Sequence, residues 1–154
     1  MELILWRHAE AEDNTGAGDQ ARALTRRGVK QAAHMADWLD QRMAEDWRIL
    51  VSSAKRTLQT VKPLEREFEV SEAIGTGTSP MALLRAAGWP DGKRNVLVVG
   101  HQPTLGEVAA ELLGVADAGL SIRKGSIWWF ASRDRGGGME TMLRAVVDTD
   151  LLDA

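Results

Sequence analysis

The chain has 154 residues, a formal net charge of −3 and no cysteine. Its length and its 44% apolar and 27% charged content are typical of one globular domain, expected over residues 1–154. The lack of cysteine excludes disulfides, thiolate catalysis and cysteine-ligated metals, and it fits a cytoplasmic protein. The negative charge and the absence of a membrane-length apolar run predict neither nucleic acid nor membrane as a partner.

The chain begins with a predicted strand and helix joined by a polar loop. Apolar residues dominate 2–6, which reads as a short buried strand. Thr25 suits the N-cap of a helix that runs to about Met43. The residues expected to face the core recur at helical spacing: Val29, Ala32, Ala33, Ala36 and Leu39.

The middle of the chain continues the alternation of strands and helices. A second strand is expected over 48–53 and a second helix from Ala54 to about Phe68. Pro63 lies inside this helix and should kink it or shift its start. A helix over 79–87 follows, and the most continuous apolar strand, over 95–100, is typical of the centre of a parallel sheet.

The last third predicts a helix and a hairpin. The helix covers 104–113, and two strands over 126–131 and 139–147 are expected at the edge of the sheet. The glycine cluster at 136–138 between them reads as a hairpin tip. Strands that alternate with helices predict right-handed βαβ units. The expected fold is therefore α/β, a three-layer α/β/α sandwich with a mostly parallel central sheet.

Polar residues with chemical potential follow three of the predicted strands. Arg7 and His8 end the first strand, Arg56 lies one helical turn beyond the second, and His101 follows the third. The carboxyl ends of parallel strands share one rim, so these side chains can converge. Arg22, in the long loop over the same rim, could join them.

Such a pocket suits phosphoryl transfer. Clustered guanidinium groups match the oxygens of a phosphate. Positive neighbours depress a histidine pKa, which would keep His8 neutral and nucleophilic near pH 7. His101 can donate to the phosphoryl oxygens as charge shifts. The pattern suggests covalent catalysis through a phosphohistidine on His8 and requires neither a metal nor another cofactor.

The three arginines and His8 also have purely structural interpretations. The Arg7–His8 pair could form an ion pair and cap a loop, and Arg56 could be an ordinary first-turn helix residue. A cation at a helix N-terminus opposes the helix dipole, however, and a bound anion would supply a reason for it. Arg22 could be a surface residue paired with Asp19.

Four sequence blocks carry a resemblance to a known family. They are Arg7-His8-Ala9, Leu24-Thr25-Arg26-Arg27-Gly28, Ser52 to Thr60, and Val99-Gly100-His101-Gln102-Pro103. Together and in this order they resemble the histidine phosphatase superfamily, which includes the phosphoglycerate mutases. The short chain and the segment 22–25 are most similar to the SixA branch, the bacterial phosphohistidine phosphatases.

The resemblance implies a phosphoglycerate mutase-like fold and a role for each site residue. His8 would accept the phosphoryl group, Arg7, Arg22 and Arg56 would bind its oxygens, and His101 would complete the pocket. The implied substrate is a histidine-phosphorylated protein, either a histidine-phosphotransfer domain or a phosphotransferase-system carrier. The resemblance implies no cofactor.

One departure from the family pattern bears on the substrate. Larger members place a general acid after the second helix, but here 73–80 holds no carboxylate, and Glu72 and Asp91 only flank it. A protonated phosphohistidine ring can leave as neutral imidazole with little assistance, whereas an alcohol needs a proton. The pocket therefore favours a P–N bond. The alternatives are a small-molecule phosphomonoesterase and a non-catalytic phosphoprotein-binding module.

Overall fold

A six-stranded sheet forms the centre of the molecule in the computed structural model, which describes residues 1–14 and 16–152. The strands run in the order β3-β2-β4-β1-β5-β6. Their bounds are β1 Glu2–Arg7, β2 Arg48–Val51, β3 Glu69–Val70, β4 Val96–Gly100, β5 Ile127–Asp134 and β6 Met139–Val147. The neighbours from β3 to β1 are parallel, whereas β5 is antiparallel to β1 and β6. The predicted, mostly parallel sheet is confirmed.

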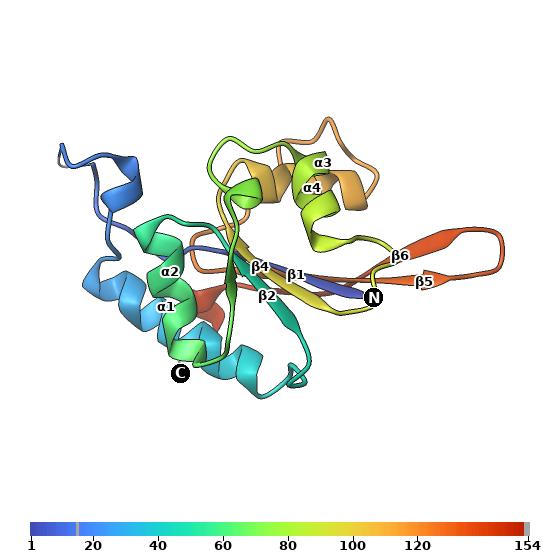
Figure 1. Cartoon of the computed structure of the whole chain (residues 1–154), viewed down its shortest axis with the longest axis horizontal. Coiled ribbons are helices and arrows are strands. Elements are labelled where there is room, and N and C mark those ends of the chain that lie inside the picture. Colours follow the sequence, from blue (N-terminus) through green and yellow to red (C-terminus); the bar gives the residue numbers. More distant parts are fainter. Residues whose placement is uncertain (15, 153–154) are drawn as a thin grey trace.

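Helices cover both faces of the sheet (Figure 1). They are α1 Arg26–Asp40, α2 Lys55–Val61, α3 Pro80–Ala87 and α4 Thr104–Leu112. Side chains of β1 alternate between two cores: Ile4 packs with Leu39 of α1, and Leu5 packs with Leu105 of α4. The three-layer sandwich is thus confirmed. Within the described residues, no helix is long and apolar enough to cross a membrane.

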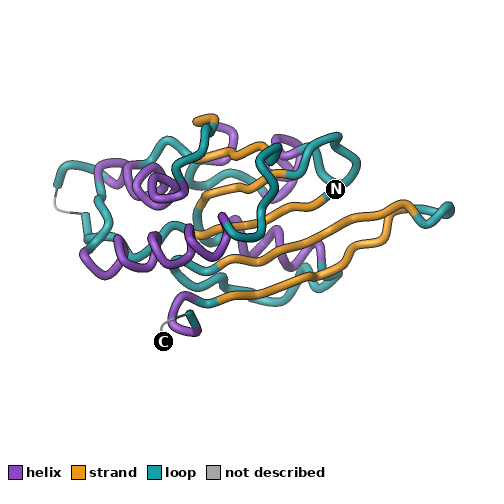
Figure 2. Tube along the Cα trace, turned by 90° about the horizontal axis from the view of Figure 1, so that it is seen from below, coloured by secondary structure: helices purple, strands orange, loops and turns teal. Residues whose placement is uncertain are grey.

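The β5–β6 hairpin projects beyond the other strands, with residues 136–138 in its tip as predicted (Figure 2). The prediction that both strands lie at the edge is right for β6 and wrong for β5, which pairs with β1 and β6. The physical reason is burial: residues 127–131 are almost all buried, so this strand needs partners on both sides.

The second helix is shorter than predicted. It ends at Val61, a single 3-10 turn covers Lys62–Leu64, and Phe68, the expected end of the helix, lies beyond this turn and is 41% exposed. Pro63 explains this end, because its ring lacks an N–H donor and clashes with the preceding turn. The chain then forms β3, which was not predicted, since its two exposed residues show no apolar alternation.

The buried face of α1 is rotated from the predicted one. Val29 is 54% exposed and Ala33 is also exposed, whereas the buried residues are Gly28, Ala32, Met35, Ala36 and Leu39. Thr25 is the N-cap, and its Oγ1 accepts the Gly28 N–H at 2.9 Å. A Cβ at Gly28 would lie 2.0 Å from the carbonyl oxygen of Glu10, so this close approach of two backbones sets the orientation of the helix.

Candidate active site

The two histidines follow adjacent central strands. Arg7 of β1 pairs with Gly100 of β4, and the His8 N–H donates to the Gly100 carbonyl at 3.1 Å. The rings of His8 and His101 lie with centroids 5.4 Å apart, and both residues are buried. The register of the sheet therefore brings together two side chains that are far apart in sequence.

His8 is a neutral imidazole with one free nitrogen. Its Nδ1 lies 2.8 Å from the Ala9 carbonyl oxygen, which can only accept, so Nδ1 carries the proton. Burial lowers the pKa of His8 to about 3, and the charges of His101, Arg56 and Arg7 act in the same direction. The hydrogen bond to Ala9 opposes this shift only in part. The Nε2 lone pair is available as a nucleophile at neutral pH.

His101 has the opposite tautomer. Arg56 Nη2, which can only donate, lies 3.3 Å from Nδ1, so the proton is on Nε2 and points to Ser52 Oγ at 2.6 Å. Burial, and then Arg56, lower the pKa of His101 to about 4. To donate to a phosphoryl oxygen through Nδ1, His101 must gain a proton, which a bound dianion favours.

A chain of hydroxyl groups holds this tautomer. Ser52 Oγ lies 2.9 Å from Thr57 Oγ1, and Thr57 in turn donates to a backbone carbonyl, with the Ala54 oxygen at 2.8 Å. Another hydroxyl of α2, Thr60 Oγ1, accepts the N–H of Ala9 at 3.1 Å and so supports the segment beside His8. None of these hydroxyls was assigned a role from the sequence, although the spacing of Thr57 and Thr60 after Arg56 places both on one side of α2.

Two guanidinium groups have buried nitrogens with no partner. Arg56 is only 3% exposed, and Arg7 donates from Nη1 to the Ile122 carbonyl at 2.9 Å. The Nε atom of each is buried without a hydrogen bond among the described residues. Burial lowers the pKa of Arg7, and a buried charged donor without an acceptor is costly. Each of the two arginines therefore has a buried charged donor without an acceptor in the described part of the chain.

Asp19 joins the third arginine to the site. Its Oδ1 lies 3.1 Å from Arg22 Nη1, and its Oδ2 lies 3.0 Å from Arg56 Nη2. Arg22 also donates from Nε to the Glu12 carbonyl at 2.7 Å. Arg22 is thus both a partner of Asp19, as its structural interpretation held, and a neighbour of the buried Arg56. The contact that was not predicted is the one between Asp19 and Arg56, because these residues are 37 positions apart in the sequence.

Three other carboxylates, those of Glu10, Glu72 and Asp91, lie apart from the histidines and arginines of the site. Glu10 accepts from Thr25 Oγ1 at 2.9 Å and lies 3.9 Å from Arg27, so it faces α1. In the part of the chain that the structure describes, Glu72 and Asp91 form no hydrogen bond or ion pair with the histidines or arginines of the site. The described residues also include no group of three or more His, Cys, Asp or Glu side chains that could hold a metal ion.

A cleft of about 310 Å³ adjoins the site at Arg7. Its lining includes the cations Arg27, Arg123 and Lys124.

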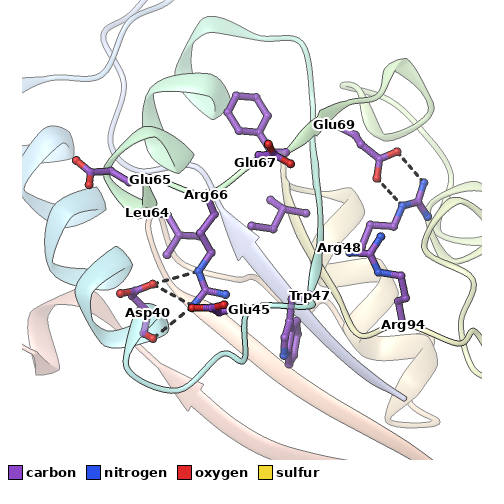
Figure 3. Close-up of a pocket in the computed structure, with 12 residues that line it drawn as sticks. Asp40, Glu45, Trp47, Arg48, Leu64, Glu65, Arg66, Glu67, Glu69 and Arg94 are labelled. Carbon is purple, nitrogen blue, oxygen red and sulfur yellow. Dashed lines mark hydrogen bonds and ion pairs between the residues drawn. The ribbon is translucent and has the colours of Figure 1, made fainter.

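A larger cleft, of about 680 Å³, begins at Arg48, at the opposite end of β2 from Ser52 (Figure 3). Ion pairs such as Arg66–Asp40 and Arg48–Glu69 link its walls. None of the predicted site residues lines the larger cleft.

Comparisons with known proteins agree with these features. The sequence model of the histidine phosphatase superfamily (branch 1) matches residues 3–75. A phosphohistidine phosphatase SixA homolog of Haemophilus influenzae is 36% identical over 131 residues, 74% of this chain and 78% of that protein. Phosphohistidine phosphatase SixA of Escherichia coli is 32% identical over 121 residues, 73% of this chain and 74% of that protein.

Solved structures show the same fold. The protein histidine phosphatase SixA complexed with tungstate superimposes with a TM-score of 0.78 at 24% identity, covering 99% of this chain and 100% of that one. A structure described as a SixA phosphohistidine phosphatase from Nakamurella multipartitia also gives 0.78, at 23% identity and with 96% and 95% coverage. The expected phosphoglycerate mutase-like fold is confirmed.

The matched sequence model and the site define the class of protein as a phosphatase of the histidine phosphatase superfamily. Two relatives above 30% identity, each covered over more than two thirds of its length, narrow this class further. The chain belongs to the SixA branch of that superfamily.

Proposed function

We propose that this phosphatase removes the phosphoryl group from a phosphohistidine of another protein and carries it transiently on His8. The observation that carries the proposal is the pairing of a neutral His8 Nε2 with the partnerless guanidinium nitrogens of Arg7 and Arg56. The names of the SixA relatives, which describe phosphohistidine phosphatases, support the choice of substrate.

The first half of the reaction transfers the phosphoryl group. Arg7, Arg22 and Arg56 bind its oxygens, and the His8 Nε2 lone pair forms the new bond to phosphorus. The P–N bond of the substrate breaks, and its electron pair returns to the departing ring. Protonated His101 donates through Nδ1 to a phosphoryl oxygen as negative charge builds up.

The second half releases phosphate, and the Ala9 carbonyl supports it. Because Nδ1 of His8 keeps its proton, the ring becomes a cation once Nε2 carries phosphorus. Water attacks phosphorus, the Nε2–P bond breaks, and His8 leaves as a neutral imidazole while the phosphate loses a proton to solvent. A cationic ring is a good leaving group, so this step needs no strong acid.

The partner belongs to the same proposal. The resemblance favours a histidine-phosphotransfer domain or a phosphotransferase-system carrier, encountered in the cytoplasm. The cleft beside Arg7, with the exposed Lys124 and Arg123 on its wall, would accommodate the chain around the phosphohistidine. The proposal needs no metal, which is a further prediction to test.

The test is phosphate release from a histidine-phosphorylated protein, measured with a chelator present. Wild type and His34→Ala, a variant of an exposed α1 histidine, should release phosphate, whereas His8→Ala should not. The wild type should also carry an acid-labile, base-stable phosphate during turnover. Release only from phosphate esters would instead indicate a phosphomonoesterase, and binding without release would indicate a phosphoprotein-binding module.

A further inference from the structure

One carboxylate touches the phosphate-binding arginines, and the steps above do not use it. Asp19 contacts Arg22 through Oδ1 and Arg56 through Oδ2. We propose that Asp19 is a specificity-determining residue, whose carboxylate accepts a hydrogen bond from the N–H of the departing imidazole and so favours phosphohistidine over phosphate esters. The inference rests on the proposed function and deepens it.

Asp19 lies where a substrate ring can reach it. Its side chain is 50% exposed, whereas that of Arg56, to which it is bonded, is 3% exposed. The carboxylate therefore lies between the buried guanidinium of Arg56 and solvent. A carboxylate has about four acceptor positions, and the two arginines occupy one on each oxygen, so each oxygen can accept a further hydrogen bond.

The segment that carries Asp19 is held at several points. The Asp19 carbonyl accepts from Arg56 Nη1 at 2.8 Å and from the Arg22 backbone N–H at 3.2 Å. The next residue, Gln20, donates from Nε2 to Ser53 Oγ at 3.2 Å. These bonds tie the turn to the end of β2 and the start of α2, so the carboxylate keeps a defined place relative to the phosphate-binding groups.

The position of Asp19 matters because of the chemistry of the leaving group. A phosphohistidine ring that is protonated on its second nitrogen leaves as neutral imidazole: the P–N electron pair returns to one nitrogen, and the proton stays on the other. A carboxylate that accepts this N–H stabilises the protonated, reactive ring without transferring a proton. Because free imidazole titrates near pH ~6.5, this stabilisation matters most above that pH.

An ester leaving group has the opposite requirement, because it must receive a proton. An alkoxide is strongly basic and needs a proton from a general acid. The hydrogen bond from Arg22, followed by that from Arg56, lowers the pKa of the Asp19 carboxyl. The group is therefore ionised at neutral pH and has no proton to give. The same residue thus assists a P–N substrate and leaves an alkyl ester without help.

The decisive experiment compares Asp19→Asn with wild type on two substrates. These are a histidine-phosphorylated protein and p-nitrophenyl phosphate, whose leaving group needs no proton. We expect kcat/KM for the phosphohistidine substrate to fall about tenfold or more at pH 8 and by less at pH 6, a difference of the order of one hydrogen bond to a charged group. We expect kcat/KM for p-nitrophenyl phosphate to change by less than about twofold.

Two further measurements separate specificity from structure. Tungstate should bind Asp19→Asn at least as tightly as wild type, because the arginines lose a competing anion but keep an amide acceptor. Asp13→Asn, which alters an exposed carboxylate of the same loop, should behave as wild type on both substrates. Equal losses on both substrates together with weaker tungstate binding would show that Asp19 only positions the arginines, and would overturn the inference.

The outcome also distinguishes the two proposals. Wild type that is active on phosphohistidine, with an unchanged substrate preference in Asp19→Asn, overturns the role of Asp19 alone. Wild type that hydrolyses p-nitrophenyl phosphate but leaves the histidine-phosphorylated protein intact overturns the proposed function and, with it, this inference.

Discussion

The two histidines of the site hold their protons on different nitrogens, and a backbone carbonyl and a hydroxyl chain select these forms. His8 points Nδ1–H at the Ala9 carbonyl, so that Nε2 is free. His101 points Nε2–H at Ser52, so that Nδ1 faces Arg56. In the proposed reaction, His8 would attack phosphorus through this free nitrogen, and His101 would take up a proton when a dianion binds.

Ser52→Ala tests this arrangement at the level of one side chain. Removal of the hydroxyl leaves the buried His101 Nε2–H without its acceptor, at a cost of about 1–3 kcal/mol. We expect kcat on a histidine-phosphorylated protein to fall roughly tenfold or more. Thr141→Ala, which removes an exposed hydroxyl of β6 far from the site, is the control and should stay close to wild type. Equal activities of the two variants would contradict the positioning role of Ser52.

Sequence motifs pointed to the residues that the site brings together, and tertiary contacts account for those that were missed. Arg7, His8 and His101 end predicted strands, so parallel topology alone predicts their convergence. Asp19 lies in a polar loop with other carboxylates, and only the folded position of α2 places it against Arg56. Ser52 lies within the strand predicted over 48–53, but its link to His101 depends on the β2–β4 pairing.

At the scale of the elements, the site depends on how α1 and α2 are placed against the ends of the strands. The helix predicted over 54–68 is too long, because Pro63 ends α2. The buried face predicted for α1 is also wrong in part, because the backbone at Gly28 lies close to another backbone segment. The helix propensity of the local sequence alone predicts neither the end of α2 nor the buried face of α1. Close backbone approach is a property of two segments, and periodicity describes only one of them.

Gly28→Ala tests the close contact between α1 and the loop after β1. The added Cβ would lie 2.0 Å from the Glu10 carbonyl oxygen, so one backbone must move. We expect the free energy of unfolding in urea to fall by about 2 kcal/mol or more, because overpacking of this kind costs roughly 1–3 kcal/mol and here meets backbone. At Gly137 in the hairpin tip a Cβ meets nothing within 4 Å, so Gly137→Ala should unfold as wild type does. A stable Gly28→Ala would show that the loop is compliant.

At the scale of the whole molecule, the buried histidines couple stability to pH. The pKa values of His8 and His101 are lowered to about 3 and about 4, whereas an unfolded histidine titrates near ~6.5. Between these values the unfolded chain binds more protons than the folded one, so stability rises with pH and is lost as the pH falls below ~6.5. The site therefore weakens the fold in acid.

The magnitude can be measured by urea unfolding at pH 5 and pH 7 in phosphate-free buffer. Each histidine should contribute a slope of up to about 1.4 kcal/mol per pH unit within the window. The double variant His8→Gln with His101→Gln should show a correspondingly shallower dependence, since the carboxylates elsewhere are unchanged. Parallel curves for the variant and the wild type would show that neither histidine is held neutral by the fold.

The parts of the site should differ in how easily they open. His8 is bonded to the backbone of Gly100 at the carboxyl ends of the two central strands, and we expect such an amide to exchange with solvent only when the sheet itself unfolds. Asp19 and Arg22 belong to an exposed turn over the rim, which can open by itself at lower cost. Under mild denaturation the protein should therefore lose its hold on the substrate while its nucleophile remains in place, and KM should rise before kcat falls.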